Sequence, residues 1–351
     1  MRVLVTGHEG YIGTVMAPFI AEAGHDVCGL DAGFYDECVI GGDTAPPSVA
    51  DTRLDIRDIE RRHLEGFDAV IHLAALSNDP LGDLDPELTY DINHKASRRL
   101  ARLAREAGVE RFLFASSCSL YGVAGDSVLL DETAEFNPIT PYGKTKVMME
   151  RDLSGLASSE FSPTYMRNAT VYGFSPRFRA DIVVNNLVGL AHTTGEIVLT
   201  SDGSPWRPLV HVEDVCRAFL SVLEAPRERV HDTAFNVGRT GENYQIQEIA
   251  EIVADAMPDT RISLADGASA DPRDYRVDCS RLAETLPDYS PQWTVPDGVL
   301  ELRDAFRRHG LDEDDVHHRC VRLERIAELQ EKGLLDAHLR WSEQAVPHTG
   351  P

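Results

Sequence analysis

The chain has 351 residues, of which 42% are hydrophobic and 26% charged, proportions typical of a globular protein with one large core or two joined lobes. Its formal net charge of −24 argues against nucleic acid or an anionic membrane as a partner. An anionic ligand would therefore have to be held by a few local arginines. We expect no signal peptide before the first strand and no apolar run of membrane length.

The cysteines and histidines give no indication of a metal site. Since the six cysteines include no CxxC pair, we expect reduced thiols in a cytoplasmic protein. His317-His318-x-Cys320 has ligand-type side chains, but its charged helical surroundings favour surface residues over metal ligands. The sequence therefore predicts no bound metal.

The first elements in chain order are a strand, a glycine-rich turn and a helix. An apolar strand over 2–6 runs into Gly7-His-Glu-Gly10-Tyr-Ile-Gly13, and a helix-period stretch continues to residue 23. Glycines between a strand and a helix let the backbone approach a pyrophosphate, which rests on the helix N-terminus. The turn predicts a dinucleotide contact at Gly7, Gly10, Tyr11, Ile12 and Gly13.

A second strand, over 26–30, ends at Asp31. An acid at this place would accept hydrogen bonds from the adenosine ribose 2′-hydroxyl and repel a 2′-phosphate. No arginine or lysine follows within 32–36 to hold such a phosphate. The predicted cofactor is therefore NAD rather than NADP.

Strands and helices continue to alternate after this unit. We predict a strand over 68–75, a helix over 86–107, a strand over 111–117 and then a helix that contains Tyr142. Such alternation is typical of a parallel sheet covered on both faces, with ligands beyond the carboxyl ends of its strands. The expected fold is α/β: a Rossmann-type doubly wound parallel sheet with a smaller mixed C-terminal substrate lobe.

The expected domains follow from a change in character after residue 172, where proline, arginine and asparagine occur in short elements. We predict an NAD-binding domain over 1–172 with a return segment at about 209–236. The substrate lobe would comprise 173–208 and 237–302, followed by a charged helical extension over 303–351, helical from Arg303 to Trp341, to which the sequence assigns no chemical role.

Tyr142 and Lys146 form a candidate proton-transfer pair. Only four of the 34 basic side chains are lysines, and one of them lies four residues after this tyrosine. Thr140-Pro141 has the pattern of an N-cap followed by proline at the first helical position. Tyr142 would then lie in the first turn, at the positive end of the helix dipole, with Lys146 on the same face. Both effects favour a phenolate.

With these residues in view, the chain resembles an extended short-chain dehydrogenase/reductase of the nucleotide-sugar epimerase/dehydratase group. The resemblance covers roughly residues 1–300, and its marks are Thr6-Gly-x-x-Gly-x-x-Gly13, Asp31, Asp55-Ile56, His72-Leu-Ala-Ala75, Asn93, Ala115-Ser-Ser117, Tyr142-x-x-x-Lys146, Trp206-Arg-Pro-Leu-Val-His-Val-Glu-Asp214 and Asn236-Val-Gly238.

The resemblance implies roles for residues that spacing alone does not assign. It implies a catalytic set of Ser117, Tyr142 and Lys146, with Lys146 also holding the nicotinamide ribose. Asp55 and Ile56 would flank the adenine. Five further residues would line the dinucleotide: Leu73, Ala74, Ala75, Asn93 and Ala115. A homodimer through a four-helix bundle is the further expectation.

The resemblance also implies a nucleotide-diphosphate sugar as the substrate. Val184-Asn-Asn-Leu187 is similar to the loop that grips the diphosphate and uridine in UDP-galactose 4-epimerases, which assigns Asn186 and Leu187 to the substrate. Arg207 and Arg273 match arginines on the nucleotide ribose and diphosphate, and arginine suits bidentate phosphate contacts.

The reaction favoured by the sequence is 4-epimerisation. Dehydratases of this group carry an Asp-Glu pair directly after the serine or threonine, and decarboxylases carry a glutamate at the second of these positions. Here the positions hold Cys118 and Ser119, which cannot act as carboxylic acids. A reductase, dehydrogenase or dehydratase of the same family remains an alternative, and a non-catalytic NAD-binding protein is the least favoured.

One departure from the pattern concerns the substrate, and one cysteine raises a rival reaction. Thr170 stands where epimerases of this group place an asparagine, and Asn168 lies two positions earlier, which predicts an altered sugar or phosphate contact. Some reductases that epimerise C3 and C5 use a cysteine near the ketone, but theirs lies one residue after the position of Cys118. Cys118 would point to the opposite side of an extended backbone, so we expect a buried structural thiol.

Overall fold

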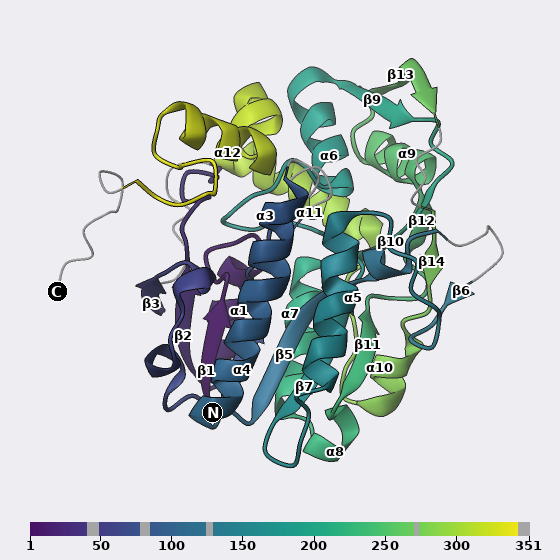
Figure 1. The fold of residues 1–351 in the computed structure, drawn as a ribbon. Coiled ribbons are helices and arrows are strands. Elements are labelled where there is room, and N and C mark those ends of the chain that lie inside the picture. The colour runs from purple at the N-terminus through teal and green to yellow at the C-terminus, as the bar shows by residue number, and fades with distance from the viewer. Residues whose placement is uncertain (41–48, 78–84, 124–128, 270–273, 343–351) are drawn as a thin grey trace.

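The computed structural model describes residues 1–40, 49–77, 85–123, 129–269 and 274–342. A seven-stranded parallel sheet with the order β11-β7-β5-β4-β1-β2-β3 forms its centre (Figure 1). The strands are β1 (Arg2–Thr6), β2 (Asp26–Asp31), β3 (Ala50–Arg53), β4 (Ala69–His72), β5 (Arg111–Ser117), β7 (Ser162–Asn168) and β11 (Thr233–Val237). The strand order reverses at β1, and this doubly wound topology confirms the predicted fold class.

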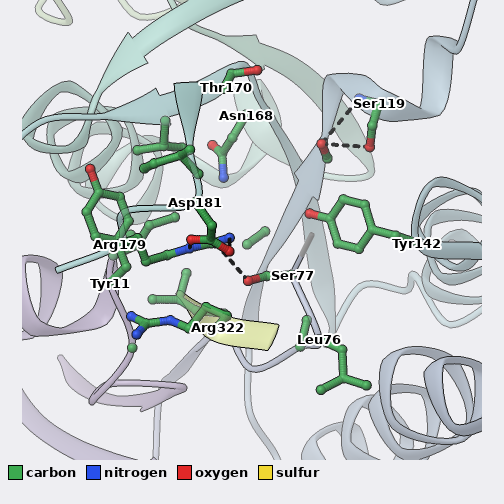
Figure 2. A pocket seen from close by; sticks show the side chains of 18 of the residues that line it. Tyr11, Leu76, Ser77, Ser119, Tyr142, Asn168, Thr170, Arg179, Asp181 and Arg322 are labelled. Carbon is green, nitrogen blue, oxygen red and sulfur yellow. Dashed lines mark hydrogen bonds and ion pairs between the residues drawn. The ribbon is translucent and has the colours of Figure 1, made fainter. Parts of the chain in front are cut away.

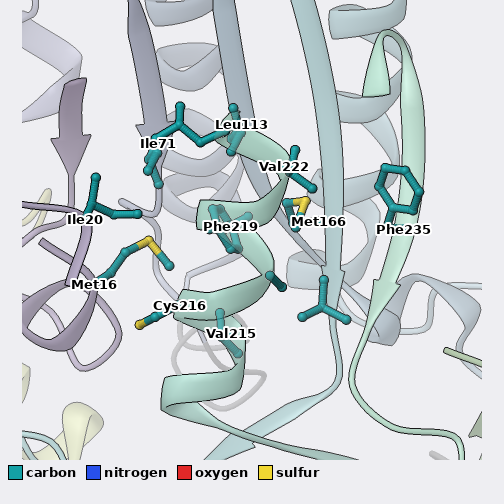
Figure 3. Packing of buried hydrophobic residues seen from close by; sticks show 14 of the residues in the cluster. Met16, Ile20, Ile71, Leu113, Met166, Val215, Cys216, Phe219, Val222 and Phe235 are labelled. Carbon is teal, nitrogen blue, oxygen red and sulfur yellow. The ribbon is translucent and has the colours of Figure 1, made fainter. Parts of the chain in front are cut away.

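Helices cover both faces of the sheet because its strands alternate apolar side chains between the two faces. On one face, Val3 and Val5 pack in a core with α1 (Gly13–Glu22) and α7 (Val212–Glu224), including Phe219 (Figure 3). On the other, Leu4 packs with α4 (Ser97–Ala107) and α5 (Pro141–Ser154). A dry core on each side holds the sheet rigid beneath its carboxyl edge.

A smaller part with mixed structure lies above that edge (Figure 1). It contains a three-stranded sheet with the order β12-β10-β8 and two separate strand pairs, β13-β9 and β14-β6. Its strands are β6 (Leu129–Leu130), β8 (Thr170–Tyr172), β9 (Glu196–Ser201), β10 (Trp206–His211), β12 (Asn243–Gln245), β13 (Arg261–Ser269) and β14 (Arg276–Val277). The remaining α-helices before residue 310 are α3 (Pro86–Tyr90), α6 (Val183–Thr194), α8 (Arg227–Val230), α9 (Ile246–Ala256), α10 (Ser280–Thr285) and α11 (Val295–His309).

Short helical turns complete the described elements. They are the 3₁₀ turns η1 (Ile56–Asp58), η2 (Arg61–Leu64) and η4 (Cys118–Tyr121), and the π-helical turns η3 (Asp91–Ala96) and η5 (Asp315–Arg319). The predicted helix over 86–107 exists as α3, η3 and α4 in direct succession. The strand predicted over 68–75 is only Ala69–His72, because the amides of Leu73 and Ala74 both donate to the Thr6 carbonyl and the chain turns away.

The C-terminal segment is not the continuous helix predicted from Arg303 to Trp341. The helix α11 ends at His309, since Gly310 adopts a left-handed conformation with φ 75°, and α12 covers only Arg322–Glu331. Residues Leu335 and Trp341 then pair across an isolated β-bridge. In Figure 1 this yellow segment lies beside the ends of β2 and α3 rather than beside the substrate lobe alone.

Candidate active site

A cavity of about 640 Å³ opens along the carboxyl ends of β1, β2, β4 and β5. Its walls come from the glycine turn, the first turns of α5, the β7–β8 connection, α6, β9 and α12. Figure 2 shows Tyr142 and Ser119 on one side of this pocket, with Tyr11, Arg179, Asp181 and Arg322 on the other. One elongated space therefore joins the glycine turn to the candidate catalytic residues.

The glycine turn has the close backbone packing that a dinucleotide cradle requires. Gly7 adopts φ +76°, and a Cβ added there would lie 2.7 Å from the amide nitrogen of Ala74. A Cβ on Gly13 would lie 2.2 Å from the Gly7 carbonyl oxygen. Both positions exclude side chains, so the backbone amides at the start of α1 stay open to a pyrophosphate. Gly7, Gly10, Tyr11, Ile12 and Gly13 all line the cavity.

Asp31 lies where the ribose of an adenosine would be bound. Its carboxylate accepts hydrogen bonds from the amides of Gly33 at 2.7 Å and Glu9 at 3.1 Å. Burial raises the pKa of Asp31, and these two amides oppose that rise. Arg53 of β3 reaches the same loop, but Asp36 holds its guanidinium at 2.5 Å. The acidic surroundings suit a free 2′-hydroxyl better than a 2′-phosphate.

The predicted adenine contacts Asp55 and Ile56 both line the cavity. Arg57 binds both oxygens of the Asp55 carboxylate through Nε and Nη2, with the closest contact at 2.6 Å. Arg340, from the far end of the chain, lies 3.4 Å from the same carboxylate. This ion-pair cluster fixes the position of the Asp55 carboxylate at the end of the cavity.

Most of the residues predicted to line the dinucleotide lie in the wall of the cavity. Leu73, Ala74, Ala75 and Ala115 line the cavity, whereas Asn93 is absent from its described lining. Asn93 is buried behind the wall, where its side-chain amide exchanges hydrogen bonds of 2.8 and 2.9 Å with the backbone of Leu76. Its observed contact is with the loop that shapes the wall, because the polar groups of this buried turn need partners.

The candidate catalytic residues converge where β5 meets α5. Thr140 caps α5 by accepting from the Gly143 amide at 3.2 Å, with Pro141 in the first turn as predicted. This start places Tyr142 on the cavity side, and Figure 2 shows its hydroxyl pointing into the pocket. Ser117, at the end of β5, accepts hydrogen bonds from the amide and the hydroxyl of Ser119 at 3.2 and 2.9 Å.

Lys146 is held beside Tyr142 in a dry position. The side chain is 4% exposed, and its Nζ donates to the Ala115 carbonyl at 2.6 Å. The same nitrogen lies 5.3 Å from the centroid of the Tyr142 ring. Burial lowers the pKa of Lys146 to about 7, although Glu150 opposes the shift. An anionic group that enters the cavity would therefore favour the charged form of this amine.

At the substrate end the structure brings together most of the predicted residues. Asn168, Thr170, Asn186, Leu187 and Arg207 all line the cavity. Asn168 is 7% exposed, and its Oδ1 has no hydrogen-bond partner among the described residues. A buried acceptor without a partner indicates a ligand donor at this point. Arg273 lies outside the described residues.

Cys118 does not face the reaction, as expected for a structural thiol. It is 1% exposed, donates to the Arg167 carbonyl at 3.1 Å and belongs to a separate apolar cluster. Burial raises the pKa of its thiol well above the ordinary value. Among the histidine and cysteine side chains near the C-terminus, His317 and His318 are exposed, but Cys320 is buried, which corrects the expectation of a surface thiol.

Several cavity residues escaped the sequence analysis. Arg179 makes a two-point ion pair with Asp181 at 2.9 Å and donates to Ser77 at 3.1 Å. Burial alone would raise the pKa of Asp181, but Arg179 outweighs it and the pKa falls below its ordinary value. Arg322 enters from α12. The arginine-rich run over 177–181 was visible in the sequence, but no spacing indicated which arginine would face the cavity.

Comparisons with known proteins agree with this geometry. The model of the NAD dependent epimerase/dehydratase family matches residues 3–238. The chain belongs to that family. A UDP-glucose 4-epimerase of Lactobacillus helveticus is 28% identical over 320 residues, which cover 86% of this chain and 95% of that protein. The family assignment and the NAD complexes among similar structures make this chain an NAD-dependent enzyme.

Solved structures of similar proteins show the same fold. The UDP-glucose 4-epimerase of Thermus thermophilus, in complex with NAD, is 26% identical with a TM-score of 0.74 and covers 88% of this chain and 99% of that one. MoeE5, in complex with UDP-glucuronic acid and NAD, is 25% identical with a TM-score of 0.77 and the same coverage of both chains.

In the part of this chain that the structure describes, no helix combines the length and apolarity needed to cross a bilayer.

Proposed function

We propose that this enzyme epimerises a nucleotide-diphosphate sugar at C4 through a transient 4-keto sugar. The observation that carries the proposal is the convergence of Ser117, Tyr142 and Lys146 on one end of the NAD cavity, next to the unpartnered Oδ1 of Asn168. The relatives named UDP-glucose 4-epimerase support the same reaction.

Each residue of the set has a distinct task. Bound NAD, held by the glycine turn and Asp31, would supply the acceptor and donor of the C4 hydride. Tyr142, as phenolate, takes the proton of the sugar O4. It returns this proton after the keto sugar has rotated in the cavity to present its other face. Ser117 donates a hydrogen bond to the carbonyl oxygen. The charged form of Lys146 stabilises the phenolate, and its anchor at the Ala115 carbonyl fixes its position.

The acidic residues of the cavity support epimerisation over elimination of water. Three carboxylates occur in the described lining, namely Asp31, Asp55 and Asp181. Asp31 and Asp55 lie at the adenosine end, and Asp181 is paired with Arg179. Ser119, where a dehydratase or decarboxylase would carry an acid, hydrogen-bonds Ser117 instead. An epimerase needs no further acid, since the same tyrosine serves both directions.

The sugar is proposed to differ from glucose and galactose. Thr170 and Asn168 both line the cavity, so the shifted asparagine still faces the substrate side. Its acceptor Oδ1 would bind a sugar hydroxyl, while Arg207, Asn186 and Leu187 would hold the nucleotide diphosphate. Arg273 is proposed as a second contact to the same group.

The decisive experiment incubates the purified enzyme with a panel of nucleotide sugars, separates the products and follows NADH absorbance. An epimerase yields a C4 epimer of at least one sugar with no net change in NADH. Stoichiometric consumption of added NADH would indicate a reductase, and a product lighter by one water would indicate a dehydratase. Unchanged sugars across the whole panel would contradict the proposal and favour a non-catalytic role.

The proposal also includes a cytoplasmic homodimer. All six cysteines are free thiols, which suits a reducing compartment. The helices α4 and α5 lie side by side on one face of the sheet (Figure 1), where a second copy would complete a four-helix bundle. Light scattering coupled to size exclusion tests the dimer, and a monomeric mass at assay concentrations would contradict it.

A further inference from the structure

The C-terminal extension is built into the nucleotide side of the cavity. Ile326 and Leu329 of α12 lie in the same core as Leu30 of β2 and Ile56 of η1. Ten residues after α12, Trp341 donates from its indole Nε1 to the Ala32 carbonyl at 2.6 Å. Arg57 donates to two carbonyls of the same segment, those of His338 at 2.8 Å and Leu339 at 3.0 Å. These contacts fix the extension against the loop that follows Asp31.

Arg322, the first residue of α12, lines the cavity although it is 3% exposed. Its guanidinium stacks 4.3 Å above the ring of Tyr35, which is itself a cavity residue. The Nη2 atom donates to the Arg177 carbonyl at 3.2 Å. The Nη1 atom is buried and has no hydrogen-bond partner among the described residues.

The carboxylates near Arg322 are bound by other arginines. Asp181 is held by Arg179 through two contacts of 2.9 Å. On the same helix as Arg322, Arg325 binds Glu37 at 2.8 Å and Glu328 at 2.5 Å. No ion pair of Arg322 occurs within the described part of the chain. A buried cation without a carboxylate partner is costly unless an anion from outside compensates it.

We propose that Arg322 is a diphosphate-binding residue, supplied to the cavity by the C-terminal extension. Figure 2 shows its side chain on the same side of the pocket as Tyr11 and Arg179. A diphosphate has the charge and the oxygen spacing that a guanidinium binds in a bidentate manner. The diphosphate can belong to NAD or to the nucleotide sugar, and only the second case rests on the proposed function.

The test measures binding rather than turnover, so that it does not depend on the reaction. Full-length Arg322→Met and Arg325→Met proteins are compared with the wild type. Arg325 is the matched control because it is 5% exposed and lies one turn further along α12, outside the described cavity lining. Retained NAD per chain and the Kd for added NAD form the first arm. The Kd for UDP, measured on protein saturated with NAD, forms the second, with adenosine and uridine as ligands that lack phosphate.

We expect Arg322→Met to weaken one diphosphate ligand by roughly 10- to 100-fold, the range for removing a charged hydrogen-bond donor. The arm that shows the loss identifies the source of the diphosphate. Adenosine and uridine should bind as they do to the wild type. Arg322→Lys keeps the charge but not the planar guanidinium with its paired N–H donors, so it should recover part of the affinity. Affinities for both NAD and UDP within twofold of those of Arg325→Met would overturn the proposal.

Thermal unfolding without ligand separates this role from a purely structural one. Because Arg322 is buried and forms no ion pair with a carboxylate of the described residues, Arg322→Met should keep or raise the Tm of the ligand-free protein. Arg325→Met should lower it, since that substitution leaves Glu37 without its partner. If Arg322→Met lowers the Tm as much as Arg325→Met and leaves both affinities intact, Arg322 only anchors the extension and the proposal is wrong.

Discussion

The two ends of the NAD cavity are assembled from different parts of the chain. At the reaction end, Ser117, Tyr142 and Lys146 come from β5 and α5, which both lie within residues 111–154. At the adenosine end, Asp31 ends β2 and Asp55 caps η1, but the contacts beside them come from the end of the described chain: Arg340 lies near Asp55, and Trp341 donates to the Ala32 carbonyl. The chemistry thus rests on a local unit, whereas the nucleotide side depends on contacts across the whole chain.

This difference has a physical basis. A strand followed by a helix fixes the spacing of a tyrosine and a lysine on one helical face without help from distant residues. Arg322 has no such spacing to a motif, because the tertiary packing of α12 brings it to the cavity. We therefore expect changes at the reaction end to affect turnover, and changes in the extension to affect stability and nucleotide binding.

The largest expected effect is that of Tyr142→Phe at the reaction end. Removing the phenol oxygen should lower kcat by about 10³-fold, within the usual range for a general acid–base group. The affinity for NAD should change by less than about twofold, as measured by calorimetry. Tyr289→Phe is the control, because its buried hydroxyl has no hydrogen-bond partner among the described residues and lies outside the described cavity lining. Retained turnover in Tyr142→Phe would remove this residue from the mechanism.

The next effect concerns the docking of the extension. Leu329 is 1% exposed in the core shared with β2, so Leu329→Ala should lower the free energy of unfolding by about 3 kcal/mol. NAD affinity should fall with it, while kcat at saturating NAD should change little. Leu300→Ala on α11, where the side chain is 39% exposed, provides the comparison and should cost less than about 1 kcal/mol. Equal unfolding midpoints for the two variants would mean that the extension is not docked in solution.

A smaller effect is expected from the pH dependence of stability at Lys146. Burial lowers the pKa of Lys146 to about 7 in the folded protein, whereas an unfolded lysine titrates at about 10.4. Between these values the unfolded chain binds more protons, so raising the pH stabilises the wild type relative to Lys146→Met. The difference in unfolding free energy between the two proteins should shift by about 2 kcal/mol from pH 7 to pH 9, in favour of the wild type.

Denaturant titrations of both NAD-free proteins at several pH values measure this shift. Comparing the two proteins at each pH cancels the contributions of the cysteines and tyrosines, which titrate in the same range. A constant difference across the range would show that Lys146 keeps its ordinary pKa and that the reaction end is wetter than its 4% exposure implies.

The smallest expected effect is that of Asp31→Asn at the adenosine end. The amide keeps the shape of the carboxylate but loses its charge, so NAD should bind about 10-fold more weakly and NADP should gain relative to it. Asp26→Asn, at the exposed start of β2 and therefore at the opposite edge of the sheet, is the control and should leave the ratio of the two affinities unchanged. An unaltered preference in Asp31→Asn would place cofactor selection in the neighbouring acidic groups instead.

Local order in the sequence predicted the dinucleotide-binding unit and the candidate catalytic pair. A glycine turn between a strand and a helix, an acid at the next strand end, and a tyrosine and lysine one turn apart have fixed relations along the chain, and the structure places them around one cavity. The alternation of strands with helices likewise predicted the parallel sheet, whose two faces the helices cover.

Tertiary structure alone decided which further residues reach the cavity. Asn93 has the expected motif position but turns its amide to Leu76, and Arg322 carries no motif yet faces the ligand space. Thirty arginines look alike in the sequence, because the partner that neutralises each one is set by packing between distant segments. The sequence by itself therefore predicted the kind of chemistry. The folded chain decided which arginines lie in the cavity without an ion-pair partner among the described residues.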